Sequence, residues 1–341
     1  MRVSDFTYDL PEDLIAQHPP KVRGTSRLLV LDKQTGKINH KQYSDFADYV
    51  QRGDVVVLND TKVIKARLIA KNIKGQIREL LLLEDHHNTD FKRRKALYRG
   101  KLRKGELLSV KGTKITVDDV LEGGIANISA QSNLLELAEH EGSVPLPPYM
   151  KRQATREDVK RYQTIFAHFP GSVAAPTASL NFTHELELKI LAKGAKIVYL
   201  TLHVGLGTFL PIRSDDLTDH KMHSEYFEIP ADTISAIRQA KQNKNRIFAV
   251  GTTVARTLEY NHSNFSCDSI ENWNGEADIF IYPGYEFKVV DALLTNFHAP
   301  KSTVLMLAAA FAGWDNLHRA YEAAIKEKYA FLSYGDSMLI F

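Results

Sequence analysis

Two patterns of apolar and polar positions run along this chain. In five stretches apolar residues recur every three or four positions, which is the spacing of one helix face. They predict helices at residues 186–192, 231–241, 254–260, 304–312 and 316–328. Short apolar runs lie among them and predict buried strands at 54–58, 196–202, 246–250 and 278–282. Helices that alternate with buried strands are typical of an α/β sheet.

The pattern changes between residues 66 and 129. Apolar and polar residues alternate there in five short segments separated by turn residues such as Lys74-Gly75, at 66–73, 76–83, 106–110, 114–120 and 125–129. Such segments predict a small β-barrel. The fold class is therefore mixed α/β: residues 1–64 and 150–341 form a discontinuous α/β catalytic body, and residues 65–149 form an inserted all-β barrel module. The proline-rich run 145–149 is the expected return connection.

Composition narrows the class of protein. The chain has 341 residues, enough for two domains, and its 44% hydrophobic and 25% charged content is ordinary for a soluble globular protein. No apolar run reaches the roughly 18 residues that span a bilayer. The first residues lack the apolar stretch of a signal peptide, and the single cysteine, Cys267, excludes an internal disulfide framework, so we expect a cytoplasmic protein. Cys267 lies in a polar stretch, 261–274, that reads as a loop, and a catalytic thiol is not expected.

The densest polar chemistry follows the predicted strand 196–202. Two blocks, 202–209 and 220–226, contain His203, His223 and Glu225 together with Gly205, Gly207 and Thr208. A strand end lets backbone and side chains reach a ligand, so we expect the centre of an active site there. The alternative is a glycine turn with histidines that only pack. A dinucleotide-binding fingerprint is disfavoured, because no third small residue follows and Phe209-Leu210-Pro211 does not open a helix.

Four further blocks combine polar groups with turns. Asn59, Asp60 and Lys62 follow strand 54–58, with an Asx turn as an equally good reading. Thr252 and Thr253 open a helix after Gly251, where N–H groups bind anions or merely cap the helix. Tyr282 and Tyr285 are aromatic rings around a Pro-Gly turn, suited to stacking on a base or a sulfonium. Asn296 and His298 lie in a polar loop, for which a functional role is favoured over a role in folding.

Taken together, these blocks resemble the S-adenosylmethionine:tRNA ribosyltransferase-isomerase family of queuosine biosynthesis. The resemblance runs from residues 6–11 to 334–340. Its markers are segments 14–17, 58–63, 144–149, 171–178, 250–253 and 282–285, together with Arg23, Arg27 and the two central blocks. One departure stands out. Where the family continues Gly-Leu-His-Phe-Thr, this chain has Ser179-Leu180-Asn181-Phe182-Thr183. An amide takes no proton at neutral pH, so a general-base role at that position does not carry over.

The resemblance implies an α/β body with a separate β-barrel and a defined reaction. The ribosyl part of S-adenosylmethionine moves to 7-aminomethyl-7-deazaguanine at the wobble position of tRNA and isomerises, giving epoxyqueuosine-tRNA and releasing adenine and methionine. S-adenosylmethionine is then a consumed substrate, with no separate cofactor. His203 or His223 is the expected base, Glu225 a ribose or sulfonium partner and His298 the acid. The expected substrate contacts are Arg23, Arg27, Asn59, Asp60, Lys62, Thr177, Asn181, Gly205, Gly207, Thr208, Thr252, Thr253, Tyr282, Tyr285 and Asn296.

The RNA partner implied is a tRNA anticodon loop, whose unpaired bases stack on aromatic rings. Tyr149, Tyr282 and Tyr285 are the candidate platforms. Residues 91–104 hold eight basic side chains and no acid, although a solvated charged loop explains each of them equally well. The expected phosphate contacts are Lys92, Arg93, Arg94, Lys95, Lys151, Arg152 and Arg161.

Two rival functions stay open. An ordinary S-adenosylmethionine methyltransferase is disfavoured by the missing dinucleotide fingerprint, and a non-catalytic RNA-binding protein is suggested by Asn181. No metal is expected, because no Cys or His cluster has zinc spacing. The formal net charge of +3 decides nothing about partners, and we favour a monomer.

Overall fold

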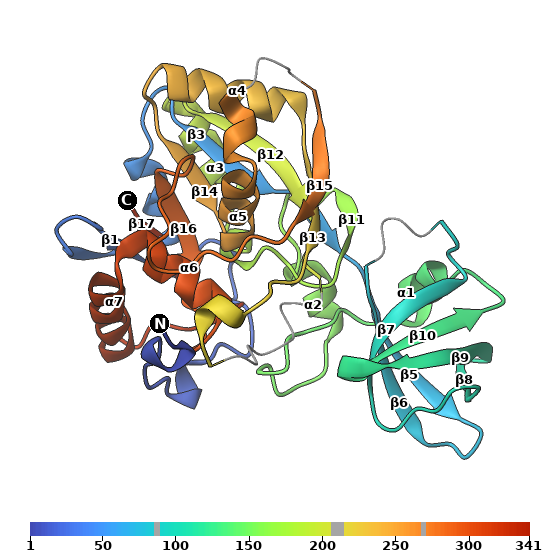
Figure 1. Cartoon of the computed structure of the whole chain (residues 1–341). Helices are drawn as coiled ribbons and strands as arrows, with labels where there is room; N and C mark the ends of the chain where they lie inside the picture. Colours follow the sequence, from blue (N-terminus) through green and yellow to red (C-terminus); the bar gives the residue numbers. More distant parts are fainter. Residues whose placement is uncertain (85–88, 206–214, 267–270) are drawn as a thin grey trace.

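A nine-stranded sheet organises the α/β body. The computed structural model describes residues 1–84, 89–205, 215–266 and 271–341 (Figure 1). The strand order in the sheet is β15 (Trp273–Ala277), β13 (Glu225–Ile229), β12 (Lys196–Leu202), β3 (Val55–Asn59), β14 (Ile247–Val250), β16 (Ala292–Asn296), β17 (Ser337–Ile340), β1 (Arg27–Leu31) and β2 (Ile38–Gln42). A two-stranded parallel sheet pairs β4 (Thr61–Val63) with β11 (Phe169–Ser172).

Helices cover both faces of this sheet. Strand β3 is buried along its whole length, with Val55 and Val57 in one core cluster and Val56 and Leu58 in another. Successive side chains of a strand point to opposite faces, so each cluster fills one side of the sheet. The first cluster contains residues of α4 (Ala231–Gln242), α5 (Thr252–Tyr260), α6 (Thr303–Ala312) and α7 (Trp314–Lys326), and the second contains residues of α3 (His184–Ala192).

The central strands bring their carboxyl ends to one edge. Strand β3 pairs in parallel with β12 and β14, and β14 pairs in parallel with β16. Parallel neighbours end on the same side of a sheet, so the residues after Asn59, Leu202, Val250 and Asn296 meet there. Ligands of open α/β sheets bind at this edge. The polar blocks 59–62, 202–209, 252–253 and 296–298 begin at the end of one of these strands, whereas the block 220–226 leads into β13 and the turn 282–285 follows β15.

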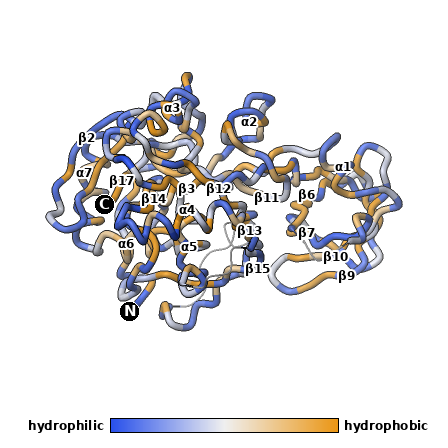
Figure 2. The backbone as a smooth tube through the Cα atoms, turned by 90° about the horizontal axis from the view of Figure 1, so that it is seen from above, coloured by the Kyte–Doolittle hydropathy of each residue, from blue (hydrophilic) through white to orange (hydrophobic). Residues whose placement is uncertain are grey.

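The inserted segment folds as a closed six-stranded barrel with its own apolar core. It lies at one end of the molecule, beyond β11 (Figures 1 and 2). All six strands fall within the predicted module, and α1 (Leu134–Glu141) follows them. The limits of the module, residues 65 and 149, stay a prediction. The strands are β5 (Arg67–Asn72), β6 (Ile77–Leu82), β7 (Arg93–Arg99), β8 (Leu107–Val110), β9 (Thr113–Leu121) and β10 (Ile125–Ala130).

The five predicted helices are confirmed to within two residues at each end, including the start of α5 at Thr252 and the end of α7 at Lys326. One predicted strand is wrong. Residues 278–282 form no strand, and β15 lies just before them, partly inside the stretch interpreted as a loop. Phe227 explains the shift, because its ring packs over Gly275 of β15 across the strand pair. The basic segment also contains a strand, β7, that the alternation rule overlooked. No described helix is both long and apolar enough for a membrane span.

Candidate active site

A cleft of about 490 Å³ opens at the carboxyl edge of the sheet. This size suits one small ligand. Its walls come from four places: the start of α5, the segment after β16, the turn around Thr177, and the proline-rich return from the barrel. Predicted site residues that line it are Thr177, Thr252, Thr253, Asn296 and His298. Val204, next to His203, lines it too.

The start of α5 presents backbone donors to the cleft. Gly251 precedes the helix with φ of 103°, a conformation that side-chain-bearing residues rarely adopt, and its N–H donates to the Leu294 carbonyl of β16. This bond fixes the helix start beside the end of β16. The first N–H groups of a helix have no partner within the helix and carry a partial positive charge. A carboxylate or hydroxyl of a ligand therefore finds donors at Thr252 and Thr253.

Two side chains at the end of β16 face the cleft and differ in how many of their polar atoms have hydrogen-bond partners. The Asn296 amide nitrogen donates to the Asp336 carbonyl at 3.3 Å, while its buried oxygen has no partner among the described residues. His298 Nε2 lies 2.8 Å from the Thr295 hydroxyl. Burial lowers the pKa of His298 to about 3, so its ring is neutral at pH 7. A role as acid then requires a ligand that raises this pKa.

The aromatic platforms separate into two groups. Tyr149 lines the cleft, its hydroxyl 2.5 Å from the Ser333 hydroxyl, and burial raises its pKa. Tyr285 instead donates to the Glu259 carboxylate at 3.0 Å, and Tyr282 packs against Phe280 at a centroid distance of 5.1 Å. Neither of these two rings lines the cleft. Tyr149 is thus the predicted platform that the structure brings to the site.

His203 lies behind the cleft wall. It is 4% exposed, and its Nδ1 is 2.7 Å from the Thr61 hydroxyl. Its ring stacks with Tyr226 at 6.1 Å and supports Gly171, where a Cβ atom would come within 2.8 Å of the imidazole. Glycine is required at position 171 by this close approach. The ring of His203 is therefore held by the Thr61 hydroxyl and is tightly packed.

Asn59 holds the strands together instead of reaching the cleft. Its side-chain oxygen accepts from the N–H groups of Thr61 and Leu202, both at 3.1 Å, and its amide donates to the Leu202 carbonyl at 2.9 Å. The bond to Thr61 is the Asx turn that was the alternative reading. Asp60 accepts from the Thr201 hydroxyl at 2.6 Å, and burial raises its pKa. Lys62 is exposed.

Glu225 belongs to an ion pair that the sequence did not reveal. Its carboxylate accepts from Arg256 of α5 at 2.7 Å and from the N–H of Gly205 at 3.1 Å. Glu225 is 5% exposed and Arg256 8%. Arg256 lies one helical turn after Thr252, so the pair joins α5 to the segment after β12. The only sequence signal was a charged residue among the buried positions of α5.

Other predicted residues lie elsewhere. His223 is exposed, and Gly207 and Thr208 fall outside the described residues. Both predicted arginines of the N-terminal segment have internal partners. Arg23 donates to the carbonyls of Leu180 at 2.7 Å and Gln163 at 2.9 Å, and Arg27 lies over the Tyr329 ring beside Asp336. The structure gives both arginines a role in folding.

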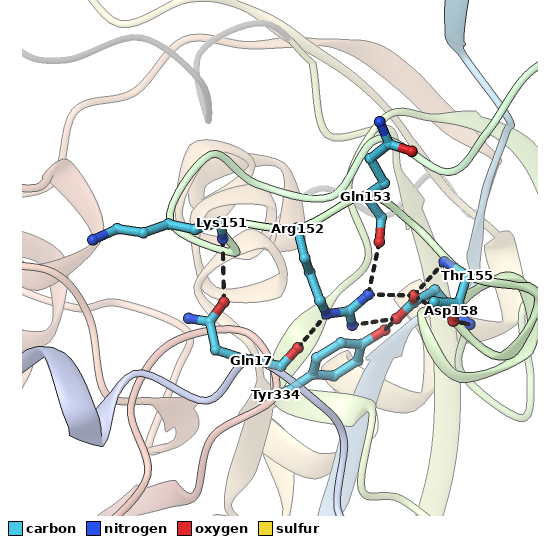
Figure 3. Close-up of polar contacts among 7 residues, drawn as sticks. All are labelled: Gln17, Lys151, Arg152, Gln153, Thr155, Asp158 and Tyr334. Carbon is cyan, nitrogen blue, oxygen red and sulfur yellow. Dashed lines mark hydrogen bonds and ion pairs between the residues drawn. The ribbon is translucent and has the colours of Figure 1, made fainter.

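Several of the seven predicted phosphate contacts have partners within the protein. Arg152 grips Asp158 with two hydrogen bonds of 2.7 and 2.8 Å, and Tyr334 and Thr155 donate to the same carboxylate (Figure 3). These bonds hold the pKa of Asp158 well below its usual range. Arg161 donates to the carbonyls of Pro20 and Lys21, and Lys151 pairs with Glu12 at the surface. Arg94 is 5% exposed. The phosphate contacts of these residues stay a prediction. Lys92, Arg93 and Lys95 are exposed, as expected.

Comparison with known proteins decides the family. A family model described as "Queuosine biosynthesis protein" matches residues 3–340. The chain is 53% identical to an S-adenosylmethionine:tRNA ribosyltransferase-isomerase of Chlorobaculum parvum and 45% identical to one of Francisella tularensis, with all of each chain covered. The chain belongs to the queuosine biosynthesis protein family. A solved S-adenosylmethionine tRNA ribosyltransferase of Thermotoga maritima is 36% identical, with a TM-score of 0.57 over 99% of this chain.

The queuosine-family segment that departs from the expected motif is buried beside the cleft. Ser179 is fully buried, and its hydroxyl has no partner among the described residues. Asn181 is 3% exposed. Neither residue lines the cleft, although Thr177 and Ala178 just before them do. Within the described residues, no cluster of three or more His, Cys, Asp or Glu side chains is placed to hold a metal ion. The absence of a metal stays a prediction.

Proposed function

We propose that the protein is an S-adenosylmethionine:tRNA ribosyltransferase-isomerase. It transfers and isomerises the ribosyl moiety of S-adenosylmethionine onto 7-aminomethyl-7-deazaguanine at the wobble position of tRNA, forming epoxyqueuosine-tRNA. Adenine and methionine leave. The observation that carries this proposal is the match to proteins of that name along their full length at 45–53% identity.

The cleft offers groups suited to S-adenosylmethionine. In our proposal the donors of Thr252 and Thr253 at the positive end of α5 receive a carboxylate or ribose hydroxyl of the substrate. The unpaired oxygen of Asn296 accepts from an N–H such as the adenine amino group. The ring of Tyr149 provides a stacking surface in the same cleft. S-adenosylmethionine is consumed, and no separate cofactor is proposed.

The reaction asks for a base and a proton donor. The sulfonium acidifies the ribose 5′ carbon, and the departing adenine takes up a proton. We assign the base to His203 in preference to His223, because His203 adjoins the cleft wall at Val204 whereas His223 is exposed. His298 is the proposed donor to adenine, and negative charge that develops on the leaving base raises its pKa. Glu225 acts by positioning Gly205, through its bond to that N–H.

One incubation tests the proposal. Purified protein, S-adenosylmethionine and an anticodon stem-loop carrying 7-aminomethyl-7-deazaguanine should yield adenine and methionine in equal amounts, with no methyl group on the RNA. A stem-loop with plain guanine lacks the attacking amine and serves as the control, which should give no adenine. Adenosylhomocysteine or methylated RNA would identify a methyltransferase, and RNA binding without consumption of S-adenosylmethionine would identify a binding protein. We further propose a cytoplasmic monomer, since its tRNA substrate is cytoplasmic and one cysteine suits that compartment.

A further inference from the structure

A second cavity lies where the barrel meets the α/β body. It measures about 510 Å³ and shares no lining residue with the cleft. One wall comes from the barrel, with Phe91 and Arg94, another from α1, and a third from Pro170 and Gly171 of β11. The remaining lining is mixed. Ile64, Leu83, Leu135 and Ala138 are aliphatic, whereas Lys65, Glu84, Thr89, Glu136 and Glu139 are polar or charged. We call this space the junction cavity.

A buried arginine and an exposed aromatic ring meet in the junction cavity. Side chains alternate along β7, so Arg93 and Lys95 are exposed whereas Arg94 between them is 5% exposed. The Arg94 guanidinium lies 5.3 Å from the centre of the Phe91 ring, which is itself 49% exposed. A half-exposed phenylalanine at the mouth of this partly apolar cavity leaves a ring face for a planar ligand. Nucleobases stack on such aromatic and guanidinium surfaces.

The charges around the junction cavity suit one strand of RNA. Lys92 and Lys95 are exposed beside Phe91 and can contact phosphates. Glu136 and Glu139 of α1 line the cavity and can accept hydrogen bonds from ring N–H or amino groups of a base. Lys65 anchors Glu139 at 2.9 Å. Apolar walls, carboxylate acceptors and outer lysines together match a base inserted from a charged backbone.

The junction cavity lies close to the active-site cleft. Gly171 lines the cavity and packs on the His203 ring, and Ala174, three residues further along the chain, lines the cleft. Three extended residues span about 10 Å at most. A strand of RNA can therefore place one base in each site.

We propose that the junction cavity binds an unpaired nucleobase of the anticodon loop that neighbours the modified one, stacked on Phe91 and beside Arg94. This inference rests on the proposed function, because it takes tRNA as the substrate. Bound there, the neighbouring base orients the strand so that the reacting base points toward the cleft. The cavity is a positioning site and takes no part in the chemistry.

A substitution at the ring tests the site. Phe91→Ala removes the stacking face, and one base stack on an aromatic ring is worth roughly 5- to 100-fold in affinity. We expect KM for the modified stem-loop to rise by that factor, while kcat and the affinity for S-adenosylmethionine stay within twofold. Leu107→Ala is the matched control, because Leu107 is also 49% exposed on the barrel and does not line the cavity. It should leave all three values unchanged.

An abasic scan identifies the bound base. Stem-loops that lack one unpaired base at a time should bind the native protein more weakly, and for one position the Phe91→Ala variant should show no further loss. The inference is overturned if Phe91→Ala leaves KM unchanged, or if its effect is equal for every abasic RNA. The proposed function fails separately, if the native protein releases no adenine from the intact modified stem-loop.

Discussion

The ion pair between Glu225 and Arg256 gives the sharpest structural prediction. Glu225→Gln keeps the shape of the side chain but removes its charge, so the Arg256 guanidinium is left buried without a counter-charge. Breaking a buried pair on one side costs about 3–5 kcal/mol. The free energy of unfolding of a domain is about 5–15 kcal/mol. We therefore expect Glu225→Gln to lower the urea midpoint strongly, while the variant stays folded in buffer.

A double variant separates the charge from the position of the loop. Glu225→Leu combined with Arg256→Met removes both charges, which is close to neutral for a buried pair. The N–H of Gly205 still loses its acceptor, at about 1–3 kcal/mol. Stability should therefore recover by about 2 kcal/mol relative to Glu225→Gln. The rate of adenine release by the double variant should nevertheless be ~10²-fold below that of the native protein, because the segment after β12 is no longer held to α5.

A pair at the opposite edge of the sheet is the control. Arg246 and Asp54 are 2.7 Å apart at the amino ends of β14 and β3. Asp54→Asn should lower the urea midpoint but leave kcat of the folded protein unchanged. The reasoning is refuted if Glu225→Gln unfolds at the native urea midpoint, or if the double variant regains full adenine release.

Three further outcomes follow from single side chains. Gly171→Ala should lower kcat by ~10²-fold in the adenine-release assay with little change in S-adenosylmethionine KM, because the new Cβ displaces the His203 ring. Because burial lowers the pKa of His298 to about 3, this histidine binds a proton below pH 6.5 in the unfolded chain but not in the folded chain. The free energy of unfolding should thus fall by up to about 1.4 kcal/mol per pH unit on acidification. Urea unfolding measured at several pH values should show that the stability of His298→Gln depends less steeply on pH than that of the native protein. Asn181→His should change turnover only a few-fold, since position 181 does not line the cleft; a rise of ~10²-fold would show that it supplies a proton.

Local chemistry made helices α3 to α7 and eight of the described strands predictable. The Thr183 and Ser302 hydroxyls cap α3 and α6 by accepting from Leu186 and Leu305, so periodicity and caps agree on where those helices begin. Strand β15 was missed because it contains Asn274 and Gly275, which disfavour strands. Its position depends on the Phe227 ring across the pair, a contact between residues far apart in the sequence.

The edge of the sheet at which the cleft lies was predictable because parallel strands share an edge. Thr252 after β14 meets Asn296 and His298 at the end of β16 in one cavity, whereas the predicted centre at His203, His223 and Glu225 does not line it. The partners of the arginines were not predictable. Arg23 donates to a carbonyl 157 residues away, and an arginine in a motif looks the same whether its partner is a phosphate or a backbone oxygen. The ion pair of Arg256 was not predicted for the same reason, because the sequence does not show which group an arginine contacts.

Asn59 and Asn296 show which motif residues remain available to a ligand. Both amides follow parallel strands at the same edge and both are buried. Asn59 uses its oxygen and its nitrogen on the backbone of Thr61 and Leu202, and its nitrogen also donates to the Thr253 hydroxyl at 3.4 Å. The oxygen of Asn296, in contrast, has no partner among the described residues. An unsatisfied buried polar atom costs about 1–3 kcal/mol, which a ligand recovers when it donates a hydrogen bond there. The free oxygen of Asn296 is what our proposal assigns to the ligand, whereas the bonds of Asn59 belong to the fold.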